Sequence, residues 1–168
     1  MILLYQDESA IRDYQAIQKS WFLIGQQRII PTYGQHKSVK LLGVLNYETG
    51  EVLVEEAEHY DATVFQTFLE KVLAHYPEGS IIMVLDNARI HHAKLIQPFL
   101  KDNPRLELVF LPPYSPNLNP IERLWRWLKD TCINNVFYSN STQIRESVDT
   151  FIDWVNTIPQ TAIDRLCL

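Results

Sequence analysis

The sequence IIMVLDN, residues 81–87, sets the architecture that we expect for this chain. Five consecutive apolar residues are followed by Asp86 and Asn87. A short, wholly apolar run of this kind is typical of a central strand of a parallel sheet that is covered on both faces. Asp86 then marks the carboxyl end of the strand, which is where open α/β sheets usually place their functional sites.

Helical and extended patterns alternate around this strand. Asp61 is a suitable cap for a preceding helix, which Pro77 and Gly79 end. The apolar positions of that helix follow helical spacing: Phe65, Phe68, Leu69, Val72 and Leu73. After the central strand, we expect a helix at about 91–100 and a strand at 106–111.

The N-terminal third predicts further strands. An apolar strand at 2–5 should end where residues 6–9, QDES, turn polar. Residues 40–46 and 51–56 are expected to form a hairpin around a turn at 47–50. Residues 21–25 could add a short extended piece, although the segment 10–38 is hard to interpret.

The C-terminal third predicts an irregular connection followed by helices. Prolines at 112, 113, 116 and 120 exclude a regular element there. Asn119 followed by Pro120 is a strong helix start, and Leu124, Trp125 and Leu128 give that helix an apolar face. A last amphipathic helix should begin near Ser141.

These elements predict an α/β fold with a mixed five-stranded sheet. An antiparallel hairpin joins parallel strands, and helices flank both faces. Repeats, low-complexity tracts and linkers are absent from the sequence, so we expect one domain over residues 1–168.

Composition excludes several classes of protein. The net charge is −5, with 15 Lys and Arg against 20 Asp and Glu, which argues against a free-standing nucleic-acid binder. Cys132 and Cys167 lack the paired spacing of a zinc cluster or disulfide framework. The longest apolar run is far shorter than a membrane span of roughly 20 residues, and the N-terminus lacks a basic leader. We therefore expect a cytosolic protein without membrane contact.

Three acidic residues from distant parts of the chain are the candidates for chemistry. Asp7 follows the first strand, Asp86 follows the central strand, and Glu122 lies in the first turn of the helix after the proline-rich segment. If the first and central strands are parallel neighbours, their carboxylates lie side by side.

Such clustered carboxylates repel one another unless a cation binds them. Oxygen ligands suit Mg²⁺, with Mn²⁺ as a substitute, and two ions together can hold the attacking and leaving oxygens of a phosphodiester displacement. Two simpler readings remain open. Glu122 could complete a capping box with Asn119. Glu8 is a rival ligand, although strand alternation directs it to the opposite side of the sheet from Asp7.

Three strings carry a resemblance to a known family: QDES at 6–9, LDNARIHHAK at 85–94 and FLPPYSPNLNPIERLWRWLK at 110–129. The chain resembles the catalytic domain of mariner-like bacterial insertion-sequence transposases, members of the DDE superfamily of endonucleases with an RNase H-like fold. The resemblance implies that Asp7, Asp86 and Glu122 are the catalytic, metal-binding triad. It also implies cleavage of transposon ends and their joining to target DNA with Mg²⁺.

Other residues near the triad have weaker signals. We expect Asn87, His91 and Asn119 to support the acidic residues. His91 and His92 are adjacent and cannot easily share a zinc ion. Trp125 is better explained by packing than by base stacking. Five basic residues near the triad have two possible roles, a contact with a DNA phosphate or an ordinary solvated surface charge. They are Arg89, Lys94, Arg123, Arg126 and Lys129.

Full-length members of the family carry helix-turn-helix modules before the catalytic domain, and we expect this chain to be the catalytic domain without them. The missing region would recognise transposon ends and supply positive charge. We expect the active assembly to be a homodimer. Two alternatives are a nuclease or resolvase that only hydrolyses DNA, and a catalytically silent fragment that regulates full-length transposase through dimer contacts.

Overall fold

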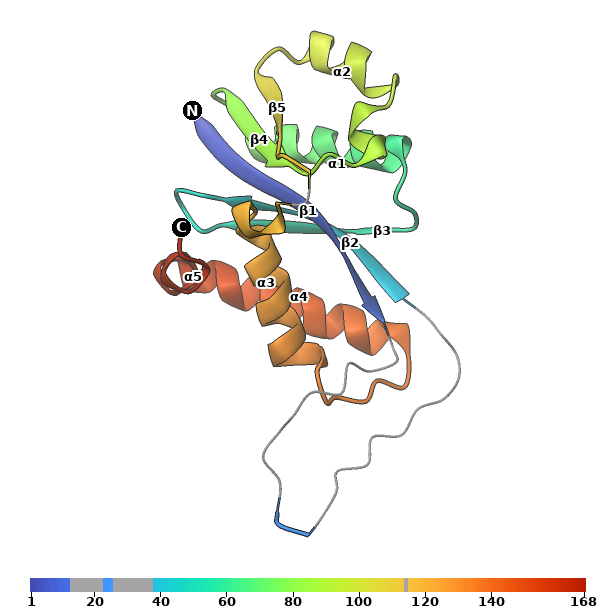
Figure 1. Ribbon diagram of the computed structural model, residues 1–168, viewed down its shortest axis with the longest axis vertical. Helices are drawn as coiled ribbons and strands as arrows, with labels where there is room; N and C mark the ends of the chain where they lie inside the picture. Colours follow the sequence, from blue (N-terminus) through green and yellow to red (C-terminus); the bar gives the residue numbers. More distant parts are fainter. Residues whose placement is uncertain (13–22, 26–37, 114) are drawn as a thin grey trace.

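A five-stranded mixed sheet in the order β3-β2-β1-β4-β5 forms the centre of the protein (Figure 1). The computed structural model describes residues 1–12, 23–25, 38–113 and 115–168. The strands are β1 Ile2–Arg12, β2 Ser38–Asn46, β3 Val52–Ala57, β4 Ile81–Leu85 and β5 Leu106–Phe110. β1 and β2, like β2 and β3, pair antiparallel, whereas β1, β4 and β5 run parallel. The predicted mixed sheet is confirmed.

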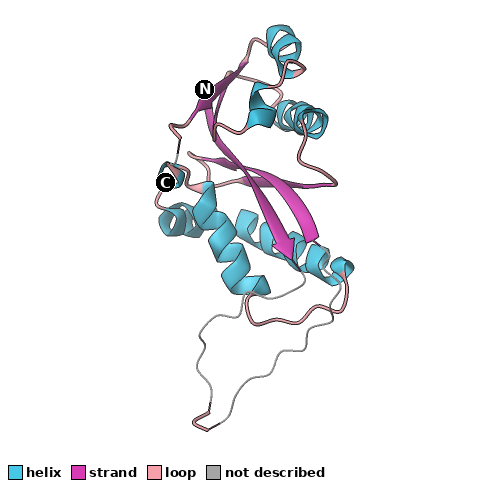
Figure 2. Ribbon diagram, turned by 45° about the vertical axis from the view of Figure 1, so that its right-hand side comes forward, coloured by secondary structure: helices cyan, strands magenta, loops and turns pink. Residues whose placement is uncertain are grey.

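Helices cover both faces of the sheet, as predicted (Figure 2). The α-helices are α1 Ala62–His75, α2 Ile96–Asp102, α3 Ile121–Leu128, α4 Ser141–Thr157 and α5 Pro159–Leu166. The apolar residues of α1 and α2 form one buried cluster with β4. Those of α3, α4 and α5 form a second cluster against β1, β2 and β3. The site described below lies where β1, the end of β4 and the start of α3 meet.

β1 is much longer than expected. The prediction that it ends before residues 6–9 is wrong, because β2 pairs with it continuously from Leu4 to Arg12. Part of the polar surface of this strand finds partners there: the side-chain amide N–H of Gln6 donates to Glu8 at 3.2 Å, although the buried Oε1 of Gln6 has no partner among the described residues. Asp7 therefore lies within a strand rather than in a loop after one.

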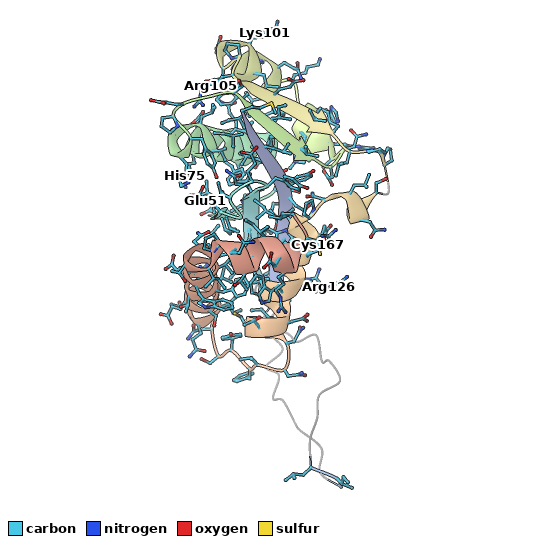
Figure 3. All side chains as sticks on the ribbon, turned by 90° about the vertical axis from the view of Figure 1, so that its left-hand side faces the viewer. Glu51, His75, Lys101, Arg105, Arg126 and Cys167 are labelled. Carbon is cyan, nitrogen blue, oxygen red and sulfur yellow. The ribbon has the colours of Figure 1, made fainter. Side chains whose placement is uncertain are left out.

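The helix before the central strand forms as predicted. The Asp61 carboxylate accepts hydrogen bonds from the backbone N–H groups of Thr63 and Val64, both at 2.9 Å, and all five predicted apolar positions of α1 are buried. At the other end, His75 lies 2.9 Å from Glu51, and the two side chains are neighbours in Figure 3. α1 is thereby fixed against the hairpin.

The prediction of one continuous helix at about 91–100 is wrong in detail. A 3₁₀ turn, Arg89–His92, comes first, and α2 begins only at Ile96. Pro98 explains the break, because a proline has no N–H to donate to the preceding turn and is tolerated only near a helix start. This leaves His91 in a short turn directly under the end of β4.

The two faces of the central strand, β4, are not equally buried. Ile81, Met83 and Leu85 of β4 are completely buried on the α1 side, as predicted, but Ile82 and Val84 on the other face are only half-buried. Of the extended piece proposed at 21–25, residues 21 and 22 lie outside the described residues, and in the described part Ile24 and Gly25 form a turn instead of a strand. The structure thus leaves one face of β4 more open than expected.

The last predicted helix is confirmed as α4, with Ile144, Val148, Phe151, Ile152 and Val155 buried. The last helix, α5, was not predicted; it starts with Pro159 and buries Ala162 and Leu166 one turn apart. In the described part of the chain, none of the helices is long and apolar enough to span a membrane.

Candidate functional site

The pairing of two parallel strands places Asp7 beside Asp86. The register of β1 and β4 ends with Tyr5 opposite Val84. Asp7 and Asp86 each lie two residues beyond this last β1–β4 pair, so they stand side by side where these two strands separate, while Asp7 stays paired with β2. The predicted juxtaposition of these two carboxylates follows directly from the strand order.

Glu122 reaches the same place from the start of α3. The alternative role of Glu122, a capping box with Asn119, is not found, since the N-cap residue is Pro120 and no side-chain hydrogen bond caps this helix. Instead, the Asn119 side chain donates to the main-chain oxygen of Gln6 on β1 at 2.9 Å. This bond ties the beginning of α3 to the strand that carries Asp7, so Glu122 projects toward it.

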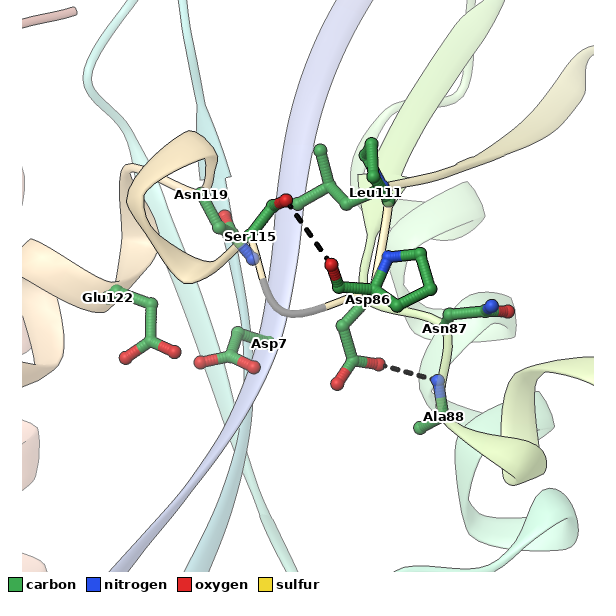
Figure 4. Close-up of a pocket in the computed structure, with 10 residues that line it drawn as sticks. Asp7, Asp86, Asn87, Ala88, Leu111, Ser115, Asn119 and Glu122 are labelled. Carbon is green, nitrogen blue, oxygen red and sulfur yellow. Dashed lines mark hydrogen bonds between the residues drawn. The ribbon is translucent and has the colours of Figure 1, made fainter.

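The three carboxylates line one cleft of about 380 Å³ (Figure 4). In the close-up, Glu122, Asp7 and Asp86 lie in a row across it. The remaining lining residues come from the turn after β4 and the proline-rich segment: Asn87, Ala88, Leu111, Pro112, Pro113, Ser115 and Asn119. Three segments that are far apart in the sequence therefore meet in a single cleft.

Mutual repulsion and burial disfavour a charge on Asp7. Burial, followed by the negative charges of Glu122, Glu8 and Asp86, raises the pKa of Asp7 to about 7. The main-chain N–H of Glu8 acts in the opposite direction but does not outweigh it. The ionised form of Asp7 therefore needs a compensating positive charge near neutral pH.

A buried histidine holds Asp86 from the α1 side of the sheet. His91 is 1% exposed, and its Nδ1 lies 3.1 Å from the main-chain oxygen and 3.2 Å from Oδ1 of Asp86. Its Nε2 lies 3.0 Å from Oε1 of Glu8. Burial lowers the pKa of His91, but the hydrogen bond to Glu8 and the charges of Glu8 and Asp86 raise it overall. The imidazole thus links the two acidic groups.

Asn87 and the five basic residues that were candidates for phosphate contacts differ in what they contact and in how exposed they are. Asn87 interacts with His92, whose ring packs against Phe110. Arg123 donates to the main-chain oxygen of Leu166 and is thus engaged with α5. Arg89, Lys94 and Arg126 are exposed, and Lys129 is half-buried. Arg126 lies on the outer side of the α3 region in Figure 3.

Sequence reasoning missed two contacts within the site. Trp125 was assigned to packing alone, yet its indole N–H donates to Oδ2 of Asp7 at 3.1 Å. The prediction that Glu8 points to the opposite side of the sheet from Asp7 is correct, but the contact of Glu8 with His91 was not predicted. The spacing of Trp125 three residues after Glu122, on the same helix face, was the available signal.

The donor chemistry of this cleft fits a divalent metal ion. Asp7, Asp86 and Glu122 supply hard oxygen ligands, and a cation would relieve the electrostatic penalty that raises the pKa of Asp7. Ligand atoms of Glu8, Asp86 and His91 also lie within 4.8 Å of one another. In that second group both ring nitrogens of His91 already have partners in Asp86 and Glu8, so the cleft is the better candidate for holding an ion.

Comparisons with known proteins agree with the motifs. A family model for DDE superfamily endonucleases matches residues 2–145. The insertion element IS630 uncharacterized 39 kDa protein of Shigella sonnei is 33% identical over 158 residues, which cover 94% of this chain and 46% of that protein. Protein y4pE/y4sA of Sinorhizobium fredii is 31% identical over 85 residues, which cover 50% of this chain and 60% of that protein. The chain spans about half the length of these curated relatives.

Solved transposase structures share the fold. The Mos1 transposase paired-end complex with left transposon end has a TM-score of 0.71 at 18% identity, covering 98% of this chain and 53% of that one. The Mos1 mariner paired end complex with Mn has a TM-score of 0.69 at 17% identity, with the same coverage. These matches confirm the predicted RNase H-like architecture. Since the family model covers most of the sequence, this chain belongs to the DDE superfamily endonucleases.

Proposed function

We propose that this chain is the catalytic domain of a transposase that cuts DNA at transposon ends and joins those ends to target DNA. The observation that carries this proposal is the cleft in which Asp7, Asp86 and Glu122 meet, in a member of an endonuclease family. On this proposal, residues 1–168 form one catalytic domain, and DNA-end recognition belongs to another region of a longer protein.

Asp7 and Asp86 would hold Mg²⁺ or Mn²⁺, and Glu122 would complete the ligand set of a second ion. When bound, the two ions supply charge stabilisation for the attacking and leaving oxygens of an in-line displacement at phosphorus. The chain itself contributes the positions of the ligands. Main-chain pairing sets Asp7 and Asp86, and the Asn119 bond to Gln6 sets the start of the helix that carries Glu122.

The same residues support the two successive reactions. A water molecule is the nucleophile for cleavage, and a DNA 3′ hydroxyl is the nucleophile for joining. Asn87, His91 and Asn119 would keep the acidic residues in place, because each lines the cleft or contacts a residue that does. The half-buried Asp7 would release its proton as the metal binds, since its pKa lies near neutrality.

DNA would approach along the exposed rim of the cleft. Phosphate contacts are proposed for Arg89, Lys94, Arg123, Arg126 and Lys129. The net charge of −5 predicts weak DNA binding by this chain alone. We further propose that the active assembly is a homodimer, that a separate region recognises the DNA ends, and that the protein acts in the bacterial cytosol.

The test restores a recognition region to the chain and supplies a DNA end with a free 3′ hydroxyl, target plasmid and Mg²⁺. We expect joined products from the wild-type chain and none from Asp86→Asn. Cleavage without joined products would instead indicate a hydrolytic nuclease or resolvase. A folded, dimeric protein that neither cleaves nor joins DNA would indicate a regulatory fragment and overturn the proposal.

A further inference from the structure

Trp125 contacts one of the three acidic residues directly. Its side chain is 3% exposed, and its indole N–H donates to Oδ2 of Asp7 at 3.1 Å. Trp125 follows Glu122 by three residues on α3, so the same face of the helix carries a carboxylate and an indole N–H donor. This polar contact lies next to the cleft, whereas the rest of the ring is packed.

A glycine on the neighbouring strand makes room for this ring. Gly43 of β2 pairs with Asp7 of β1. A Cβ atom at Gly43 would lie 2.6 Å from Cη2 and 2.7 Å from Cζ2 of Trp125. Any larger residue would therefore push the indole away from the sheet. The absence of a side chain at position 43 lets the ring lie against β2 with its N–H directed at Asp7.

We propose that Trp125 is a positioning residue that holds the Asp7 carboxylate in the orientation required for binding a divalent cation. This inference rests on the proposed function of the cleft. An indole suits the task because it is a donor only and carries no charge. It therefore restrains a carboxylate without neutralising it and without competing with the cation, as a lysine or arginine would.

The contrast with Glu122 strengthens this interpretation. Within the described residues, no side chain donates a hydrogen bond to the Glu122 carboxylate, and this side chain is exposed. Asp7 is therefore held in advance, whereas Glu122 is left to adjust to what binds. Restraining one ligand lowers the conformational entropy that the site must lose on binding the ion.

The first experiment compares Trp125→Phe with Trp127→Phe. Both variants remove an indole from a buried position of α3, but Trp127 packs against Phe151 and Trp154 and is not among the described residues that line the cleft. Mn²⁺ affinity is measured by titration of free Mn²⁺. We expect about a tenfold loss of affinity for Trp125→Phe, as is typical when a group supporting a ligand is removed, and less than a twofold change for Trp127→Phe.

Equal affinities of Trp125→Phe and the wild-type chain would overturn the inference, and so would an equal loss in both variants. If the wild-type chain itself binds neither Mn²⁺ nor Mg²⁺, the metal site of the proposed function fails first. That result differs from the failure of the inference alone, in which the wild-type chain binds the ion and Trp125→Phe binds it equally well.

A second measurement needs no tryptophan variant. The assigned indole ¹⁵N–¹H signals of the wild-type chain are followed during Mg²⁺ titration. We expect the Trp125 signal to shift with saturation while the Trp127 signal stays in place, and we expect Asp7→Asn to abolish this response. An unmoved Trp125 signal in a chain whose Tm rises with Mg²⁺ would contradict the inference.

Discussion

Replacing Asp7 by asparagine should stabilise the metal-free protein above neutral pH. Burial and the neighbouring negative charges raise the pKa of Asp7 from 3.8 to about 7. A difference of about three pH units corresponds to a ceiling of about 4 kcal/mol of unfavourable free energy in the folded, ionised state. Because Asp7 borders an open cleft, we expect about half of that, or roughly 2 kcal/mol, which raises Tm by about 4–8 °C in a chain of this size.

The sign follows from the direction of the pKa shift. Below about pH 4, Asp7 is protonated in the folded and unfolded chains, so the carboxyl imposes no electrostatic cost. Between about pH 4 and pH 7 the unfolded chain loses this proton first, and the wild-type protein loses stability relative to Asp7→Asn. Above about pH 7 the carboxyl is ionised in both states, and the difference becomes constant.

Thermal unfolding from pH 4 to pH 8 with a chelator present measures this difference. Asp153→Asn is the matched control because Asp153 is an exposed carboxylate on α4, where such a substitution changes stability by about 0.5 kcal/mol or less. If Asp7→Asn is less stable than the wild-type chain at pH 8, or follows the control at every pH, the carboxylates do not repel one another as described.

Three further outcomes are expected. Asp86→Asn should leave the circular dichroism spectrum unchanged and abolish DNA joining by the chain with a restored recognition region; joining at the wild-type rate would remove this residue from the catalytic group. Mn²⁺ affinity, measured by calorimetry, should rise with pH up to about pH 7, with proton release, because the cation competes with the Asp7 proton; a flat profile from pH 5.5 to pH 8 would contradict this. Gly43→Ala should lower the free energy of unfolding by about 1–3 kcal/mol, because the new Cβ overlaps the Trp125 ring; an unchanged urea midpoint would show that the ring can move away freely.

The sequence predicted most of the elements that short-range patterns encode. The apolar run at Ile81–Leu85 indicated the central strand, and Asp61 with five spaced apolar residues indicated α1. These signals depend on the alternation of buried positions and on local capping, which neighbouring residues determine. The three candidate acidic residues could be identified from the sequence for the same reason, since each stands at a recognisable boundary of an apolar segment.

Contacts between distant segments were decided by tertiary structure. The bond from Trp125 to Asp7 joins residues 118 positions apart, and that from Asn119 to Gln6 joins residues 113 positions apart. Polarity at residues 6–9 suggested a strand end, whereas pairing with β2 extends β1 to Arg12. A side chain's local preferences do not contain its long-range partners. Those depend on which strands pair and in which register, and this is settled only when the whole sheet and its helices pack together.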